Sequence, residues 1–283
     1  MKIGIEKLFN DTFTRWEDEQ YEKLRGYGFE CLDIGFSNTD DWAYAEDEDV
    51  VIKKLAYERT LIENAGMSVS QVHGPWRFPP CDLEDADRAE RMAKMKKCVH
   101  LCAAIGGKNM VIHPLMPFGL EDKNTENEAK TWDINVRFMT ELATYAKAEG
   151  VNVCIENMPF KEFAISTPAE IIKIVNLVNL DNFKICFDTG HANLFKELKL
   201  GDCVRELGDM LAVLHVHDNN GIGDHHLPPY YGVANWKDFG RALKEISFKG
   251  AVSLECLPPK KISDEALDSL TKAYAQLAKD IVE

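Results

Sequence analysis

The sequence predicts an α/β protein with a single domain, a (β/α)8 TIM barrel over residues 1–283. Eight short apolar runs alternate with eight helix-compatible segments, and strands in such an order pair in parallel. No Pro/Gly/Ser-rich linker and no change in composition divides the chain. The competing arrangement, a doubly wound open sheet, usually shows a glycine-rich phosphate motif after its first strand, whereas Gly4 stands alone here. Closure into a barrel is therefore favoured.

In the first half of the chain, each predicted helix ends at a glycine, the residue most common just past helix C-termini. These helices span 14–25, 50–65, 83–105 and 132–149, and the glycines after them are Gly26, Gly66, Gly106 and Gly150. Strands are predicted between them at 2–5, 29–34, 67–72 and 110–112. The first strand leads into Glu6, the third into His73 and the fourth into His113.

The second half repeats one pattern in which a short apolar run ends in a polar side chain. The runs lie at 151–155, 183–187, around Leu214 and at 251–254, and the helices between and after them are predicted at 168–178, 196–210, 236–246 and 263–281. The residues at the ends of these runs are Glu156, Asp188, His217 and Glu255. The four consecutive runs thus end in side chains that can bind a metal ion.

The composition is that of an ordinary globular protein, with 45% hydrophobic and 28% charged residues. A net charge of −14 argues against nucleic acid as a partner, because phosphate contacts need clustered Lys and Arg. The 8 cysteines stand singly, without a CxxC pair, which is typical of reduced thiols. No signal-peptide segment and no apolar run of membrane-spanning length is present, so we expect a cytoplasmic protein with no membrane contact.

Side chains at the carboxyl ends of barrel strands converge on the barrel axis, where such folds carry their chemistry. Glu156, Asp188, His217 and Glu255 offer hard oxygens and one imidazole, which suits Mn²⁺, Mg²⁺, Co²⁺ or Zn²⁺. A lone strand-end histidine is more often a hydrogen-bonded structural group, but four such ends in succession favour a metal site.

The segment after the seventh strand carries two further candidate ligands. In His215-Val-His217 both imidazoles lie on one face of a strand, and we expect His217, nearer the strand end, to be the ligand. His215 would then support it or be a core histidine. The following loop is too long for a simple connection and brings Asp224 and His226, spaced to bind a further ion or a substrate hydroxyl.

Together these motifs resemble the xylose isomerase-like barrel superfamily over the whole chain. The superfamily includes sugar and sugar-phosphate isomerases and epimerases and metal-dependent apurinic-site endonucleases. The resemblance rests on Glu156-Asn157, Asp188-Thr-Gly-His191, His215-Val-His217, Asp224-His-His226-Leu-Pro-Pro and Glu255. It implies a metal-dependent enzyme of carbohydrate metabolism, and relatives of this kind are commonly homodimers or homotetramers.

The ketose 3-epimerases of this superfamily hold one divalent ion on a Glu, Asp, His, Glu set. The resemblance implies that Glu156, Asp188, His217 and Glu255 do so here, with Glu156 and Glu255 as the catalytic acid/base pair. It also implies that His191 holds a substrate oxygen. Proton transfer through a metal-stabilised enediolate requires a base and a metal ion, since the base must reach the C–H and positive charge must face the developing anion.

The endonucleases of the superfamily instead bind up to three zinc ions, and this sequence offers a counterpart to each ligand. The additional candidates are His73, His113, His191, Asp224 and His226. The acidic net charge and the Leu227-Pro-Pro segment favour the sugar or sugar-phosphate reading. A dehydratase acting on a cyclitol or keto-sugar is a further alternative on the same metal site.

Three features beside the ligand set bear on substrate binding. The loop of sugar enzymes usually closes on Gly-Glu-Gly, whereas Tyr230-Tyr231-Gly232 stands here, so the contacts of that glutamate are in doubt. Trp76 is a candidate for stacking on a sugar face. A packing role at the top of the barrel fits its position equally well. Glu6 is a candidate for contact with the substrate, although a solvated or capping role is the more common one.

Overall fold

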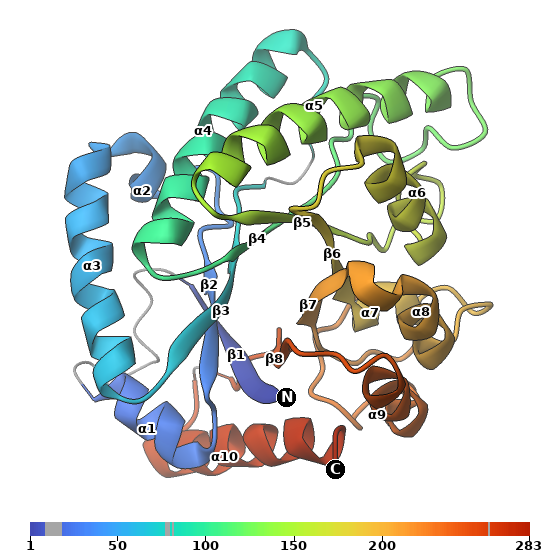
Figure 1. Cartoon of the computed structure of the whole chain (residues 1–283). Helices are drawn as coiled ribbons and strands as arrows, with labels where there is room; N and C mark the ends of the chain where they lie inside the picture. Colours follow the sequence, from blue (N-terminus) through green and yellow to red (C-terminus); the bar gives the residue numbers. More distant parts are fainter. Residues whose placement is uncertain (9–18, 77–79, 81, 260) are drawn as a thin grey trace.

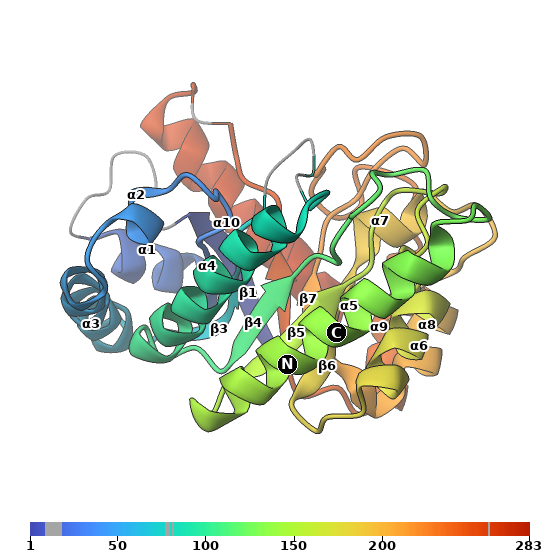
Figure 2. The ribbon, with the colours of Figure 1, turned by 90° about the horizontal axis from the view of Figure 1, so that it is seen from above.

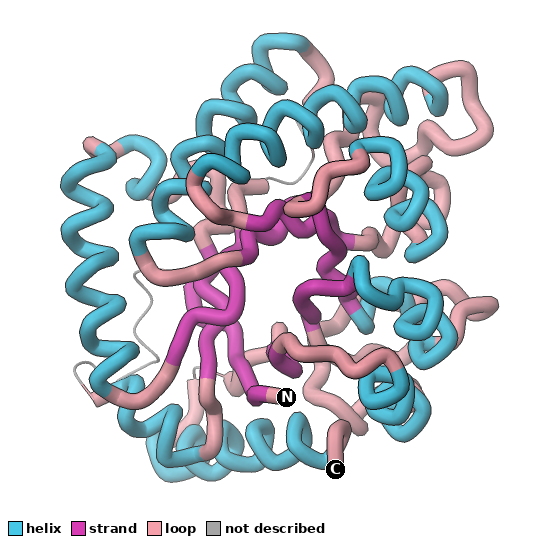
Figure 3. The backbone as a smooth tube through the Cα atoms, in the orientation of Figure 1, coloured by secondary structure: helices cyan, strands magenta, loops and turns pink. Residues whose placement is uncertain are grey.

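Eight parallel strands form the centre of the molecule, as the sequence predicts. The computed structural model describes residues 1–8, 19–76, 80, 82–259 and 261–283. The strands are β1 (Lys2–Leu8), β2 (Cys31–Gly35), β3 (Ser68–His73), β4 (Asn109–Ile112), β5 (Asn152–Glu156), β6 (Phe183–Asp188), β7 (Leu211–His215) and β8 (Ala251–Leu254). Their order is β7-β6-β5-β4-β3-β2-β1-β8, and Figure 3 shows them as a ring surrounded by helices.

Strand β8 pairs unequally with its two neighbours in the ring, β1 and β7. β1 pairs with β8 over four residue pairs, from Lys2 with Ala251 to Ile5 with Leu254. β7 and β8 share only an isolated bridge between Val216 and Leu254, in which Val216 N–H donates to Ser253 O over 2.8 Å. The barrel is therefore nearly closed, with a weak seam between β7 and β8.

Helices cover the outside of the ring (Figures 1 and 2). They are α1 (Gln20–Tyr27), α2 (Trp42–Ala45), α3 (Glu48–Asn64), α4 (Asp85–Ala104), α5 (Glu128–Ala148), α6 (Pro168–Val178), α7 (Thr189–Asn193), α8 (Leu200–Leu207), η1 (Gly208–Met210), α9 (Trp236–Glu245) and α10 (Asp264–Asp280). No helix in this described part of the chain combines the length and the apolar composition that crossing a lipid bilayer requires.

The predicted elements are present, with local differences. Residues 14–18 of the first predicted helix lie outside the described residues, and the remainder is α1. The predicted helix 196–210 begins later, as α8 and η1. The turn after Asp188 is the short helix α7, because the Asp188 carboxylate accepts a hydrogen bond from His191 N–H at 2.6 Å and caps it. Glu6 lies inside β1, which continues to Leu8, rather than at its end.

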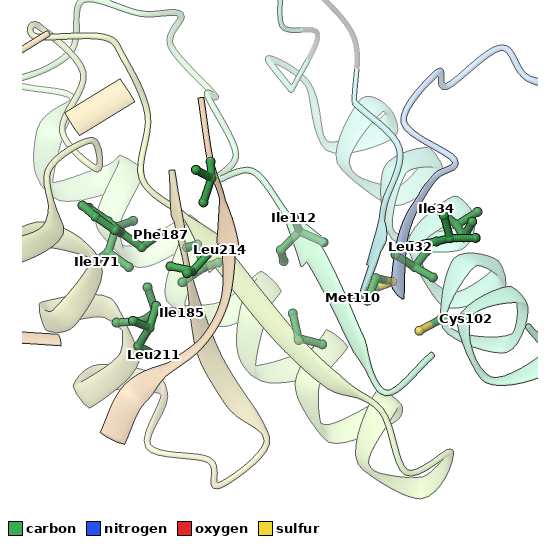
Figure 4. Packing of buried hydrophobic residues seen from close by; sticks show 14 of the residues in the cluster. Leu32, Ile34, Cys102, Met110, Ile112, Ile171, Ile185, Phe187, Leu211 and Leu214 are labelled. Atoms are coloured by element: carbon green, nitrogen blue, oxygen red, sulfur yellow. The ribbon is translucent and has the colours of Figure 1, made fainter. Parts of the chain in front are cut away.

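Strand alternation divides the buried residues into two environments. Outward-facing residues pack against the helices in one large apolar cluster, and Figure 4 shows part of it, with Ile185, Phe187, Leu211 and Leu214 of β6 and β7 and Ile171 of α6. Inward-facing residues form a second, small cluster inside the ring, which we name the floor layer: Val111, Cys154, Cys186 and Val213. Two residues further along the same strands lies the site layer: His113, Glu156, Asp188 and His215.

Candidate metal and substrate site

A cavity of about 310 Å³ opens above the site layer, at the carboxyl ends of the strands. Its lining combines carboxylates, imidazoles and an apolar wall: Glu6, Ser37, His73, Trp76, His113, Glu156, Met158, Pro159, Phe160, His191, Asp224, His226 and Glu255. None of these described lining residues is Lys or Arg. The lining is therefore largely acidic and imidazole-bearing, with an apolar part made by Trp76, Met158, Pro159 and Phe160.

Four residues at the base of the cavity bring their ligand atoms within 4.8 Å of one another, namely Glu156, Asp188, His215 and Glu255, which we call the central group. Nδ1 of His215 lies 3.0 Å from Glu156 Oε1, 3.4 Å from Glu255 Oε2 and 4.0 Å from Asp188 Oδ2. Three carboxylates thus surround one imidazole nitrogen.

The central group fits a divalent cation. Oε2 of Glu156 and Oε2 of Glu255 are buried and have no hydrogen-bond partner. Burying such oxygens without a donor or a cation is costly. An ion bound between three carboxylates and an imidazole would place positive charge beside both glutamates and offset that cost, and this donor set suits Mn²⁺, Mg²⁺, Co²⁺ or Zn²⁺.

The histidine of the central group is His215, whereas the sequence analysis favoured His217. The reason is where β7 ends. A register shift between Ile185 and Cys186 sets Asp188 opposite His215, the last residue of β7. His217 lies past the strand end, where its Nε2 is 3.1 Å from Asp188 Oδ2. The geometry therefore favours His215 as the histidine ligand and places His217 beside the group.

His73 and His113 flank the free side of Glu156. Their Nε2 atoms lie 3.5 and 3.1 Å from Glu156 Oε2, although neither pair has hydrogen-bond geometry. The two rings meet edge to face at 5.0 Å. With Glu156 they form a further group able to hold an ion. The sequence names both histidines as candidates for an additional metal ion or for substrate.

The remaining candidates lie on the other side of the central group. His191 Nε2 is 3.2 Å and His226 Nε2 is 3.4 Å from Asp224 Oδ2, and the His226 ring stacks on His217 at 4.0 Å. Nδ1 of His191 is 2.8 Å from Asn157 O, so this ring is anchored from behind. Hence the predicted ligands come together in overlapping groups that share Glu156, Asp188 and His217, and all of them except Asp188 and His217 line the cavity.

A buried carboxylate that the sequence analysis did not single out holds the loop that carries Asp224 and His226. Asp218 accepts hydrogen bonds at 2.8–3.1 Å from four N–H groups, namely those of Asn219, Gly232, Ala234 and the Trp236 indole. Its backbone also pairs with Leu227 through two hydrogen bonds. His226 then adopts a left-handed backbone (φ 46°) and faces the central group. The long run of hydrogen-bonding residues after His217 was the available signal.

The surrounding charges separate the pKa values of the two glutamates. Burial raises the pKa of Glu156, but His215 and His113 outweigh it and hold this pKa well below its usual value. Burial, opposed by His215 but reinforced by Asp188, Glu156 and Glu6, raises the pKa of Glu255 well above its usual value. Within the protein alone, these shifts favour an ionised Glu156 and a protonated Glu255.

The two candidates for substrate contact both line the cavity. Glu6 points inward beside the central group, and burial followed by the charge of Asp33 raises its pKa. Trp76 is 37% exposed and its ring lies 5.0 Å from that of His113. Trp76 and Phe160 belong to the apolar part of the lining, so a bound molecule would meet aromatic carbon as well as polar groups.

Comparison with known proteins agrees with this architecture. The xylose isomerase-like TIM barrel profile matches residues 21–273. A D-psicose 3-epimerase of Agrobacterium fabrum is 27% identical over 269 residues, 90% of this chain and 84% of that protein. One from Ruminiclostridium cellulolyticum is 28% identical over 270 residues, 90% and 83% of the two chains. The solved D-psicose 3-epimerase from Clostridium cellulolyticum H10 with D-tagatose superimposes with a TM-score of 0.78 at 19% identity, covering 100% of both chains.

Proposed function

The chain belongs to the xylose isomerase-like TIM barrel family, and from that premise we propose that it is a sugar isomerase or epimerase that uses a divalent metal ion. The observation that carries the proposal is the central group, in which Glu156 and Glu255 both approach Nδ1 of His215 and each has one unpartnered oxygen. The relatives named D-psicose 3-epimerase add that the change would occur at a carbon next to the carbonyl of a ketose.

The residues of the central group would hold the ion, and the two glutamates would move the proton. The ion would supply positive charge next to the anion that develops when a proton leaves the carbon beside a carbonyl. Glu156, whose pKa is lowered, would take that proton on Oε2. Glu255, whose pKa is raised, would give its proton to the other face of the carbon and leave the sugar epimerised.

The cavity lining supports a neutral sugar over a sugar phosphate. A phosphate in a protein site is normally held by Arg, Lys or backbone N–H groups, and no described lining residue is Lys or Arg. Glu6, Glu156, Asp224 and Glu255 would repel an added anion. The volume of about 310 Å³ also suits a monosaccharide better than a polymer.

A second candidate, a phosphodiesterase of the apurinic-site endonuclease type with up to three Zn²⁺ ions, is supported by one observation. Three groups next to the central group could hold further ions. They are His73, His113 and Glu156; Asp188, His191 and His217; and His217, Asp224 and His226. The net charge of −14 and the absence of Lys and Arg among the described lining residues count against a DNA substrate.

The test is to load the purified protein with Mn²⁺ or Co²⁺, count the bound ions and incubate it with ketohexoses in heavy water. We expect one ion in the central group and one solvent deuteron in an epimeric product. Product lighter by one water would indicate the dehydratase. About three Zn²⁺ per chain with nicking of abasic DNA would indicate the endonuclease. Turnover without deuterium incorporation would refute proton transfer.

A further inference from the structure

A buried chain of hydrogen bonds runs behind the central group, from β3 through β2 to β7. Gln71 Nε2 donates to Asp33 Oδ2 over 2.8 Å, and His215 Nε2 donates to the same oxygen over 2.9 Å. Gln71 also donates to Leu214 O over 3.1 Å, which ties it to β7. Asp33 is 1% exposed and both Gln71 and His215 are 0% exposed, so these bonds are shielded from bulk water.

This chain determines which nitrogen of His215 faces the carboxylates of the central group. A carboxylate only accepts hydrogen bonds, so Asp33 keeps a proton on Nε2 of His215. Nδ1 is then the atom that faces the central group, where it is hydrogen-bonded to Glu156 Oε1 at 3.0 Å and lies 3.4 Å from Glu255 Oε2. The ring also stacks on His73 at 5.5 Å with an interplanar angle of 12°, which restrains its rotation.

His217, one of the same pair of histidines, has no such support. Its Nε2 faces Asp188 Oδ2 at 3.1 Å, but its Nδ1 is buried without a hydrogen-bond partner. Histidines that bind metal ions almost always donate their other ring N–H to a carboxylate, a carbonyl or water, which orients the ring. Among the pair, His215 has this arrangement and His217 lacks it.

We propose that Asp33 is a positioning residue that orients His215, so that its Nδ1 faces Glu156, Asp188 and Glu255 as a ligand. Asp33 itself does not line the cavity and would touch neither substrate nor ion. Gln71 restrains Asp33 in turn. The consequence for metal binding depends on the proposed function, whereas the orientation of the ring does not, so the two can be tested apart.

The first test compares Asp33→Ala with Asp33→Asn. Both bonds converge on Oδ2, while Oδ1 has no partner, so the amide oxygen of Asn can take the place of Oδ2. We expect Asp33→Ala to raise the Kd for Co²⁺ by about 10–100-fold and to change the visible Co²⁺ spectrum. Asp33→Asn should stay close to the wild type. Equal losses in both variants would show that charge, not orientation, matters, and would overturn the proposal.

The matched control is Asp122→Ala. Asp122 is also 1% exposed and also accepts two hydrogen bonds, from Ala164 N–H at 2.9 Å and from the Thr131 hydroxyl, but it does not line the cavity. It should lower stability and leave the Kd for Co²⁺ near the wild-type value. A loss of Co²⁺ affinity equal to that of Asp33→Ala would mean that any buried defect weakens the site, and would count against the proposal.

The second test needs no metal ion. Nitrogen-15 NMR of labelled histidine, with His215 assigned by its loss in His215→Gln, should show an exchange-protected proton on Nε2 in the wild type and in Asp33→Asn. The signal should disappear in Asp33→Ala. Its persistence there would refute the orienting role, whether or not the wild type binds Co²⁺.

Should Asp33→Ala fail to fold, Gln71→Met provides the same test in milder form. This change keeps the Asp33 carboxylate and removes the two hydrogen bonds of the Gln71 amide. We expect a smaller loss of Co²⁺ affinity in the same direction and a weakened Nε2 proton signal. Unchanged values for both would contradict a restrained Asp33.

Discussion

The floor layer and the site layer lie on the same four strands, two residues apart, and are chemically opposite. Val111, Cys154, Cys186 and Val213 are buried apolar side chains in mutual contact. The site layer above them holds carboxylates and imidazoles, and Glu156 Oε2 lacks any hydrogen-bond donor. The barrel thus places an apolar layer below a layer whose polar groups are left incompletely satisfied, and the Cys186 thiol, within 4.8 Å of ligand atoms of Glu156 and His215, joins the two.

The largest expected effect comes from the site layer. Glu156→Gln keeps the size of the side chain but removes the base, so turnover should fall by at least about 10²–10⁴-fold, the usual contribution of a positioned base. The folded state should persist, because Oε2 has no hydrogen bond to lose and the Gln side chain can keep an oxygen at the position of Oε1, beside His215 Nδ1. Turnover of ketose in heavy water and thermal unfolding measure the two effects. Near-normal turnover would remove Glu156 from the mechanism.

Glu255→Gln tests the other side of the central group. The raised pKa of Glu255 indicates a protonated acid, and an amide cannot deliver that proton. We expect a loss of similar size, about 10²–10⁴-fold in turnover. Substrate binding, measured by calorimetry with the metal-loaded variant, should persist. If turnover survives, proton return must use another group.

The next largest expected effect is a loss of metal binding when either histidine of His215-Val-His217 is replaced. His215→Ala should weaken Co²⁺ binding by more than about 100-fold, since loss of an outer partner alone costs 10–100-fold. His217→Ala should also lower metal content, but less, because its Nε2 contacts only Asp188 of the central group closely. Elemental analysis after dialysis measures both. Stoichiometric metal in His215→Ala, with loss in His217→Ala, would restore His217 as the ligand.

A change in the floor layer should act on stability instead. Val213→Ala removes buried methyl groups next to Cys154 and Cys186 and should lower the free energy of unfolding by about 1–3 kcal/mol. Co²⁺ affinity should stay near the wild-type value, because His215 keeps its partners. Urea unfolding and Co²⁺ titration provide the readouts. A large loss of affinity would mean that the two layers are not separable.

The smallest expected effect concerns the thiols of the floor layer. Burial raises the pKa of Cys154 to about 12 and raises that of Cys186 well above its usual value. Thiol reagents react with the thiolate, so at pH 8 both residues should remain unlabelled in the folded protein and react after unfolding. Mass spectrometry of the labelled peptides measures this. Rapid labelling of either residue in the folded state would show that the floor layer becomes accessible to the reagent without unfolding.

The barrel and its candidate ligands could be predicted from sequence because both depend on local pattern. Apolar runs ending in Glu156, Asp188 and Glu255 mark strand ends directly. The sequence pattern favours His217 and the geometry favours His215, because the geometry depends on the register shift between β6 and β7, a tertiary feature that local pattern does not carry. Asp33 and Gln71 were missed since a single polar residue inside a strand has no ligand signature. Asp218 was missed because its partners lie up to 18 residues away.

The weak pairing between β7 and β8 has a consequence for circular permutation, in which the native termini are joined and new ones are opened elsewhere. Its isolated bridge lies at Val216, between His215 and His217, and Glu255 N–H donates to Val216 O over 3.1 Å. Every other junction of the ring is a ladder of at least two residue pairs. New chain termini placed in the loop between β7 and α9 would therefore sever the covalent link where strand pairing is weakest. A circular permutant opened there should lose metal affinity before it loses its barrel, whereas one opened between α5 and β5 should keep both.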